Sequence, residues 1–347
     1  MQTVEVKSPT NIALVKYWGK HPKYEHLLIP TKSSISFTVA GLTTTTNLAV
    51  EGGNLEIEFT LNGKRIGETQ SEFDYVREFF DRISRIYPFA KGYRYVITSK
   101  NDFPTASGFA SSASGFSALA LAFARAMTEL GALPVMDERK LSVLARLGSG
   151  SAARSVPSRG GLVIWHRGFE EAPSEGEEEA SQQSYAETLF EPPYFDDLAV
   201  IYAKVESEKE KETKSRAGMK ESLRSVYDYW GWVDYEEKHL LPATLDAIRT
   251  RNWSEMFKLT KQASNNFHSV CMRTSPPIIY LNDRSAAIIR AIEPLAYAAY
   301  TFDAGPNAVV FALKSNAEKV ERLLQEIVGK GNTFSTRVGE GPKTVPP

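Results

Sequence analysis

The sequence predicts an α+β fold, because strand-like and helix-like patterns are mixed without the regular alternation of βαβ units. Hydrophobic and polar residues alternate from Leu55 to Leu61, and Asn62-Gly63 then gives the tight turn of a β-hairpin that ends near Ile66. From about Asp74 to Ile86 the hydrophobic residues instead recur at helical spacing. A chain of 347 residues is long enough for two domains.

The remainder of the first half continues this mixture. Alternation over 93–97 predicts a strand, and helical spacing over 116–127 predicts a helix directly after a loop rich in glycine and serine. Another helix is expected over 141–147, where Gly148 ends it. The following acidic stretch, Glu177-Glu178-Glu179, is interpreted as a solvated surface loop near a domain boundary.

The second half begins with a buried strand over 198–205, and the charged stretch 206–214 is expected to be a mobile loop. The elements predicted after it are helices over 219–229, 236–249, 253–269 and 283–292, strands over 297–302 and 308–313, and a last helix from Ala317.

The composition excludes several classes of protein. The net charge is −1, so nothing in the charge balance favours nucleic acid or an anionic membrane. The N-terminal residues lack the apolar core of a signal peptide, and no apolar run approaches the length of a membrane span. Cys271 is the one cysteine and the histidines show no ligand spacing, so we expect a cytoplasmic protein without disulfides or a zinc site.

The segment from Pro104 to Gly115 is the first candidate binding element. Its small residues permit close approach to a ligand, and the helix start that follows offers unpaired N–H groups and a positive dipole end. This combination suits ATP phosphates, with Ser111 and Ser112 as further ligands. The segment is also compatible with a plain linker in which one of these serines caps the helix.

Two further segments combine charges with small residues. Asn11–Lys20 places Lys16 and Lys20 beside aromatic residues, which suits phosphate binding, although an ordinary surface turn has the same composition. Gly148–Arg154 ends in a guanidinium that can hold a carboxylate in a bidentate manner, although a helix stop with one exposed arginine is the simpler interpretation.

Two loops in the second half have the same ambiguity. Phe302–Asn307 is rich in turn-forming residues, but Asp303 at a strand end can also accept a proton from a hydroxyl. Lys214–Met219 either caps a helix with Ser215 or closes over bound phosphates.

The order of these segments resembles the diphosphomevalonate decarboxylase family of the GHMP kinase superfamily, from about residue 5 to residue 313. Lys16-Tyr17-Trp18-Gly19-Lys20 and Tyr300–Asn307 are specific to that family, whereas the serine-rich loop is shared across the superfamily. Pro30–Ser36 and Ser275–Asp283 extend the similarity. The sequence departs from the family in the serine-rich loop, where Ser107 and Phe109 stand in place of the usual alanine and leucine.

The resemblance implies a GHMP kinase fold with two domains. Residues 1–190 would resemble domain 2 of ribosomal protein S5 and carry the ATP phosphate loop, and residues 191–347 would be ferredoxin-like. The family reaction converts mevalonate 5-diphosphate and MgATP into isopentenyl diphosphate, ADP, phosphate and CO₂. ATP and Mg²⁺ are therefore the expected cofactors. The family also suggests a cytoplasmic homodimer of the mevalonate pathway of isoprenoid biosynthesis.

The resemblance also implies roles for single residues. Asp303 would deprotonate the C3 hydroxyl, Arg154 would hold the substrate carboxylate, and Lys16 would lie beside the reacting oxygens. The other substrate-binding positions would be Tyr17, Trp18, Lys20, Ser149 and Ser151. The ATP phosphates would contact Ser107, Gly108, Ala110, Ser111, Ser112, Ser114 and Ser215, and Ser112 would also bind the metal.

Three alternatives stay open at the level of sequence. A close relative would act on mevalonate 5-phosphate with the same catalytic residues, and Tyr17 and Lys20 favour the diphosphate over it. A small-molecule kinase of the superfamily would transfer phosphate without decarboxylation, which the presence of both Arg154 and Asp303 disfavours. A binding protein without catalytic activity would not need these residues.

Overall fold

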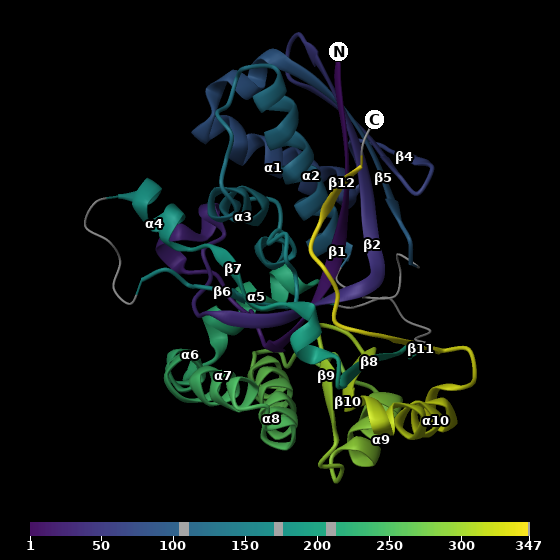
Figure 1. Cartoon of the computed structure of the whole chain (residues 1–347). Helices are drawn as coiled ribbons and strands as arrows, with labels where there is room; N and C mark the ends of the chain where they lie inside the picture. The colour runs from purple at the N-terminus through teal and green to yellow at the C-terminus, as the bar shows by residue number, and fades with distance from the viewer. Residues whose placement is uncertain (104–110, 170–175, 206–212, 346–347) are drawn as a thin grey trace.

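The computed structural model describes residues 1–103, 111–169, 176–205 and 213–345, and it combines two β-sheets with helices packed on their faces (Figure 1). The elements of the first half are β1 (Gln2–Val15), η1 (Pro22–Leu27), β2 (Ser34–Gly52), β3 (Glu56–Leu61), β4 (Lys64–Ile66), α1 (Ser71–Ile86), η2 (Pro88–Gly92), β5 (Tyr93–Asn101), α2 (Ser111–Glu129), α3 (Glu138–Arg146), η4 (Gly150–Ser155), β6 (Leu162–Trp165), α4 (Glu177–Gln183), β7 (Ala186–Phe190) and η5 (Pro192–Phe195). The elements of the second half are β8 (Leu198–Ala203), α5 (Ser215–Ser225), α6 (Tyr229–Tyr235), η6 (Glu236–Leu240), α7 (Leu241–Arg249), α8 (Trp253–Met272), α9 (Asp283–Ile292), β9 (Ala298–Phe302), β10 (Ala308–Leu313), η7 (Lys314–Asn316), α10 (Ala317–Val328), β11 (Thr333–Thr336) and β12 (Lys343–Val345).

The larger sheet is organised by β1 and β2, which pair antiparallel over most of their length. Its strand order is β12-β1-β2-β5-β3-β4, and β6 and β7 extend it beside the first residues of β2. The register of β1 on β2 shifts between Pro9 and Asn11 and again between Ala13 and Val15. Such irregularities bend a strand, and the first of them lies where β2 changes partner from β6 to β5.

Helices α1, α2 and α3 cover one face of this sheet (Figure 1). Aromatic side chains of α1, α2 and β5 form the centre of the core, and Phe79, Phe80, Tyr95 and Phe123 are essentially inaccessible. The helices predicted over 74–86 and 116–127 and the hairpin at Asn62-Gly63 are therefore confirmed.

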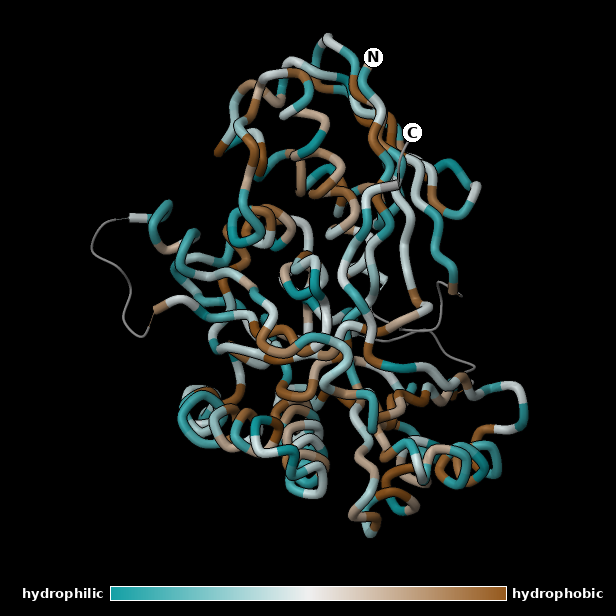
Figure 2. The backbone as a smooth tube through the Cα atoms, in the orientation of Figure 1, coloured by the Kyte–Doolittle hydropathy of each residue, from teal (hydrophilic) through white to brown (hydrophobic). Residues whose placement is uncertain are grey.

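The smaller sheet has the antiparallel order β11-β8-β10-β9. Val200 and Tyr202 of β8 pack with α7 and α8, whereas Ile201 and Ala203 pack with α9 and α10, because successive side chains of a strand point to opposite faces. Figure 2 shows hydrophobic and hydrophilic residues alternating along these helices, as expected for helices with one buried side. Ile12 and Leu14 of β1 join the first of these cores, so hydrophobic packing continues from one sheet to the other.

Three local predictions need correction. Glu177–Glu179 is not a loop but the first turn of α4, where carboxylates interact favourably with the helix dipole. The helix predicted over 219–229 is found as α5, which begins earlier, and the chain then turns at Val226 before α6. The helix predicted over 236–249 begins with the π-helical turn η6. Most of the loop predicted over 206–214 lies outside the described residues.

The predicted boundary between residues 190 and 191 falls between β7 of the larger sheet and β8 of the smaller one. The last strand of the chain nevertheless returns to the larger sheet, where β12 pairs with β1. The boundary stays a prediction. No helix among the described residues is long and apolar enough to cross a membrane.

Candidate active site

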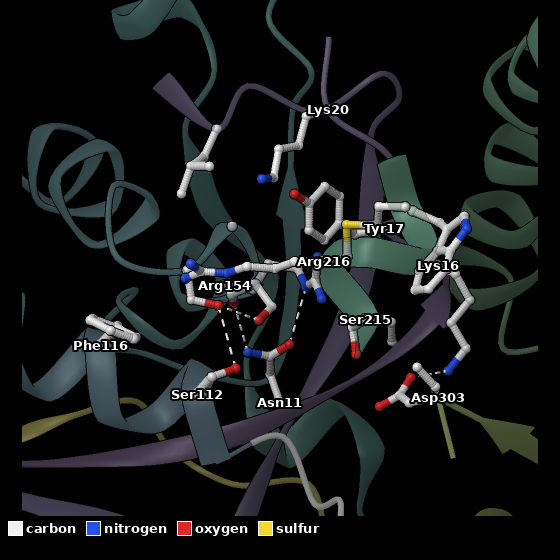
Figure 3. A pocket seen from close by; sticks show the side chains of 18 of the residues that line it. Asn11, Lys16, Tyr17, Lys20, Ser112, Phe116, Arg154, Ser215, Arg216 and Asp303 are labelled. Carbon is white, nitrogen blue, oxygen red and sulfur yellow. Dashed lines mark hydrogen bonds and ion pairs between the residues drawn. The ribbon is translucent and has the colours of Figure 1, made fainter. Parts of the chain in front are cut away.

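A pocket of about 350 Å³ lies where several elements of both halves meet. The end of β1, the start of α2, η4, the start of α5 and the β9–β10 turn all contribute to it (Figure 3). Of the residues predicted for the site, those that line it are Lys16, Tyr17, Trp18, Lys20, Ser111, Ser112, Ser149, Ser151, Arg154, Ser215 and Asp303.

Lys16 and Asp303 form the charged pair at one side of the pocket (Figure 3). Lys16 Nζ donates to Asp303 Oδ1 at 2.7 Å, and the side chain of Lys16 is 4% exposed whereas that of Asp303 is 44% exposed. Burial lowers the pKa of Lys16 and outweighs the opposing effect of Asp303, while Arg154 and Lys32 also lower it. The carboxylate therefore faces the open pocket with a buried cation behind it.

Arg154 is buried in η4, so the alternative of an exposed arginine after a helix stop is wrong. Its Nε donates to Asn11 Oδ1 and to Ser36 Oγ, both at 3.1 Å, and its Nη1 donates to Ser34 Oγ at 2.6 Å. Burial lowers the pKa of Arg154 to about 10, with Asp303 and Tyr17 opposing that effect. The guanidinium is thus held through Nε and Nη1, and Nη2 takes no part in these hydrogen bonds.

A second group of cations lies on the side of the pocket that includes Tyr17 and Lys20 (Figure 3). Burial lowers the pKa of Lys20, and the nearby Arg216 lowers it further. Arg216 donates from Nη1 to Glu78 Oε2 at 2.8 Å and from Nη2 to the Gly148 carbonyl at 2.9 Å. Its guanidinium stacks 3.9 Å from the centre of the Tyr75 ring. Two cations held in one pocket, with partly buried side chains, form a site suited to an anion.

Tyr17 depends on a glycine for its place. A Cβ at Gly150 would lie 2.8 Å from the Tyr17 ring and hydroxyl, which is too close for van der Waals contact. The ring packs edge-on against Trp165, with the ring centres 4.8 Å apart, and burial raises the pKa of the hydroxyl. Gly150 therefore lets η4 approach the tyrosine closely enough to form one wall of the pocket.

The phosphate-binding residues predicted between positions 107 and 114 divide into three groups. Ser111 and Ser112 begin α2 and line the pocket, and the Ser112 hydroxyl lies 3.4 Å from that of Ser149. Ser114 does not line it, because its buried hydroxyl pairs with Thr44 Oγ1 at 2.6 Å on β2. Ser107, Gly108 and Ala110 lie outside the described residues.

Trp18 and Gly19 support the pocket from behind. Trp18 is buried against Phe267 and Tyr280 and donates from Nε1 to Ser222 Oγ at 2.9 Å, so its main contacts are in the core. Gly19 has a φ of +116°, and a Cβ there would lie 1.8 Å from the Tyr229 hydroxyl. The segment Asn11–Lys20 therefore consists of the buried end of β1 and the five residues 16–20 after it, and the alternative of a surface turn is wrong.

Sequence reasoning left Asn11, Tyr75 and Arg216 out of the site, although all three line it. Arg216 follows the predicted Ser215 in the first turn of a helix. A cation there interacts unfavourably with the helix dipole, so the sequence contained a reason to expect a functional role for this arginine. Nothing in the sequence pattern distinguishes Tyr75 from the other aromatic residues of α1.

Comparison with known proteins decides the family. A model described as the diphosphomevalonate decarboxylase-like N-terminal domain matches residues 8–176, and a model of the mevalonate 5-diphosphate decarboxylase C-terminal domain matches residues 200–345. Diphosphomevalonate decarboxylases from Ganoderma lucidum and Candida albicans are each 34% identical to this chain over 96% and 99% of its length, and 84% and 98% of those proteins are covered. This chain belongs to the diphosphomevalonate decarboxylase family.

Solved structures of the diphosphomevalonate decarboxylase family agree with this assignment. The mevalonate diphosphate decarboxylase from Staphylococcus aureus is 27% identical, with a TM-score of 0.86 over 99% of this chain and 98% of that one. A complex of MDDEF with MVAPP, AMPPCP and magnesium is 30% identical, with a TM-score of 0.86 and 99% of each chain covered. The predicted α+β class and GHMP kinase fold are confirmed.

Proposed function

We propose that this chain catalyses the ATP-dependent decarboxylation of mevalonate 5-diphosphate to isopentenyl diphosphate, with ADP, phosphate and CO₂ as the other products. The observation that carries the proposal is the convergence of Lys16, Asp303 and Arg154, from three distant parts of the sequence, on one pocket. A complex of a family member with MVAPP, the ATP analogue AMPPCP and magnesium supports the same ligands for this chain.

The first chemical step would phosphorylate the tertiary C3 hydroxyl of the substrate. The half-exposed Asp303 carboxylate would orient this hydroxyl and accept its proton as the oxygen attacks the γ-phosphate of ATP. The buried ammonium of Lys16 would fix that carboxylate and attract the phosphate oxygens. Phosphorylation converts a poor leaving group into a good one.

The second step would break two bonds. Phosphate would leave with the electron pair of the C3–O bond, and the electrons of the bond between C2 and the carboxylate carbon would form the new double bond as CO₂ departs. Arg154 would hold the carboxylate in the required orientation through the guanidinium N–H groups that its bonds to Asn11, Ser34 and Ser36 leave unused. A planar guanidinium suits a carboxylate better than an ammonium does.

The diphosphate of the substrate would bind between Lys20, Arg216 and the Tyr17 hydroxyl. Two cations and the hydroxyl of the half-buried Tyr17, which all line the pocket, supply charge and donors for a second phosphate group. This arrangement favours the diphosphate over the monophosphate as substrate.

ATP would place its phosphates at the start of α2, where the helix dipole and unpaired N–H groups attract anions. Ser111, Ser112 and Ser215 line the pocket. No group of three or more acidic, histidine or cysteine ligands for a metal is found among the described residues. A Mg²⁺ ion bound mainly through nucleotide phosphates needs few protein ligands, and the exposed Ser112 hydroxyl fits that requirement.

The decisive test measures ADP and CO₂ release with mevalonate, mevalonate 5-phosphate and mevalonate 5-diphosphate in parallel, each with MgATP. We expect equal amounts of ADP and CO₂ with the diphosphate and little with the other two. ADP without CO₂ would instead indicate a kinase, and a preference for the monophosphate would assign the other decarboxylase activity. Absence of turnover with all three would contradict an enzymatic role in this pathway.

Three further expectations stay predictions. We propose a homodimer, a cytoplasmic location and a boundary between domains at residues 190 and 191. The first two follow only from the resemblance seen in the sequence, and the change of sheet between β7 and β8 supports the third. Light scattering of the purified chain tests the dimer.

A further inference from the structure

We propose that Lys32, Glu236 and Glu237 are positioning residues that act through β2 to hold Arg154 in its substrate-binding orientation. The inference rests on the proposed function, because it concerns the arginine assigned to the substrate carboxylate. None of the three residues lines the pocket. They connect the start of β2 with the helices α6 and α8 of the second half.

Lys32 and Glu236 form an ion pair with no solvent access. Lys32 Nζ lies 3.0 Å from Glu236 Oε2, and both side chains are 0% exposed. The other carboxylate oxygen, Oε1, accepts from Trp232 Nε1 and from Asn266 Nδ2, both at 3.2 Å. Lys32 Nζ also lies 5.1 Å from the centre of the Trp232 ring. Glu236 therefore ties together α6, α8 and the chain just before β2.

Glu237 binds the next residue of the same segment. Its two carboxylate oxygens accept from the backbone N–H and from the hydroxyl of Ser33, each at 2.7 Å. The Ser33 hydroxyl in turn accepts from the backbone N–H of Arg167 at 3.0 Å. Consecutive acidic residues thus hold the two consecutive residues just before β2.

The next residues of β2 reach Arg154. Ser34 Oγ accepts from Arg154 Nη1 at 2.6 Å, and Ser36 Oγ accepts from Nε at 3.1 Å. The contacts from Glu236 and Glu237 to Arg154 therefore follow one short stretch of chain, from Lys32 and Ser33 just before β2 to Ser34 and Ser36 in it. A small shift at Lys32 or Ser33 would move the Ser34 hydroxyl and turn the guanidinium.

The backbone around the two acidic residues is also unusual. Glu236–Leu240 forms a π-helical turn between α6 and α7. Such turns are rare and occur frequently at functional sites. A buried ion pair contributes little net stability compared with well-packed apolar residues, so its presence is better explained by a requirement for one defined arrangement.

The test compares a ligand that has the carboxylate with one that has only the diphosphate in common with it. Mevalonate 5-diphosphate carries the carboxylate and the C3 hydroxyl, and isopentenyl diphosphate lacks both but keeps the diphosphate. The variants are Glu237→Gln and the double variant Lys32→Met with Glu236→Leu, which removes both charges and leaves neither unpaired. Calorimetry measures the Kd of each ligand, and thermal unfolding confirms that each variant is folded. The matched control is Lys258→Met with Glu255→Gln, an exposed pair on α8.

We expect the Kd for mevalonate 5-diphosphate to rise roughly tenfold in both variants. The Kd for isopentenyl diphosphate should change less than about twofold. The control should bind both ligands with the wild-type Kd. Equal weakening of both ligands, or no change in folded variants, would overturn the inference. If only one variant folds, that variant decides. Failure of the proposed function is distinguishable, because the wild-type chain itself would then release no CO₂ from mevalonate 5-diphosphate.

Discussion

The Nζ atom of Lys16 lies 2.7 Å from Oδ1 of Asp303, although the two residues are separated by 287 positions in the chain. The lysine follows β1 of the larger sheet, and the aspartate follows β9 of the smaller one. The pair is asymmetric, since only the carboxylate is substantially exposed. Because of this asymmetry, the carboxylate can contact the reacting hydroxyl, and the ammonium holds the carboxylate in place.

Asp303→Asn is expected to bind mevalonate 5-diphosphate normally and to lower kcat by roughly 10³-fold or more, because the amide cannot accept the proton of the hydroxyl. Steady-state kinetics and calorimetric binding with the same substrate check this. Asp81→Asn, at an exposed position of α1, is the control and should be unchanged. Turnover near the wild-type rate in Asp303→Asn would remove the aspartate from the mechanism.

Arg154→Lys is expected to lower kcat/KM by roughly 10²-fold, although the positive charge is kept. Three hydrogen bonds to Asn11, Ser34 and Ser36 hold the planar guanidinium, and an ammonium cannot reproduce this geometry together with contacts to a carboxylate. The measurement is kcat/KM for CO₂ release. A conservative effect, with kcat/KM within about twofold of wild type, would show that charge alone is sufficient and contradict the prediction.

Gly150→Ala is expected to lower kcat/KM by up to roughly 10²-fold, because the new methyl group would lie 2.8 Å from the Tyr17 ring and displace it. If the ring moves into the pocket, kcat/KM should fall while the free energy of unfolding changes little. Gly92→Ala is the matched control, since no atom lies within 4 Å of its Cβ position. Unchanged kinetics in Gly150→Ala would mean that the position of Tyr17 is not critical.

Arg216→Ala is expected to raise the KM for mevalonate 5-diphosphate by roughly 10- to 100-fold, because one charged donor to the diphosphate is lost. Arg224→Ala lies on the same helix and removes an exposed arginine paired with Glu221, so it should leave KM unchanged. Parallel assays of both variants provide the comparison. The idea fails if the two substitutions have the same effect.

His268 predicts a pH dependence of stability. Its side chain is buried beside Phe302, and burial lowers its pKa from 6.5 to about 3, with Lys16 acting in the same direction. Between these values the unfolded chain binds one more proton at this position than the folded chain does. The free energy of unfolding therefore falls as pH falls, by up to about 1.4 kcal/mol per pH unit from this residue.

Chemical denaturation of His268→Asn between pH 6.5 and 4 should give a shallower pH dependence than wild type, because asparagine does not titrate. His239→Asn, at an exposed position, should keep the wild-type slope. Parallel curves for wild type and His268→Asn would mean that the histidine is protonated in the folded chain.

Much of the local structure was predictable from the sequence. The helix at 283–292 and the strand at 308–313 were predicted with the bounds that the structure has. The first has a helical periodicity, and the second is a short apolar run after clear turn residues. The break between α5 and α6 was not predicted, since Val226 and Tyr227 fit a continuing helix as well as a turn. The register shifts that bend β1 also leave no signal in the periodicity.

The candidate site was predictable in its residue types but not in its connections. The order of motifs pointed to Lys16, Arg154 and Asp303, and the structure brings all three to one pocket. The burial of Arg154 and the pair Lys32–Glu236 could not be predicted. Each depends on which distant surfaces pack together.

The sequence by itself determined the family, the mixture of helices and strands, and the chemistry that the side chains can perform, because these depend on local pattern and on the identity and order of residues. Only the tertiary structure decided which charges are buried and which face the pocket. The physical reason is that desolvation and hydrogen bonding depend on distances between residues far apart in the chain, such as the 2.7 Å between Lys16 and Asp303.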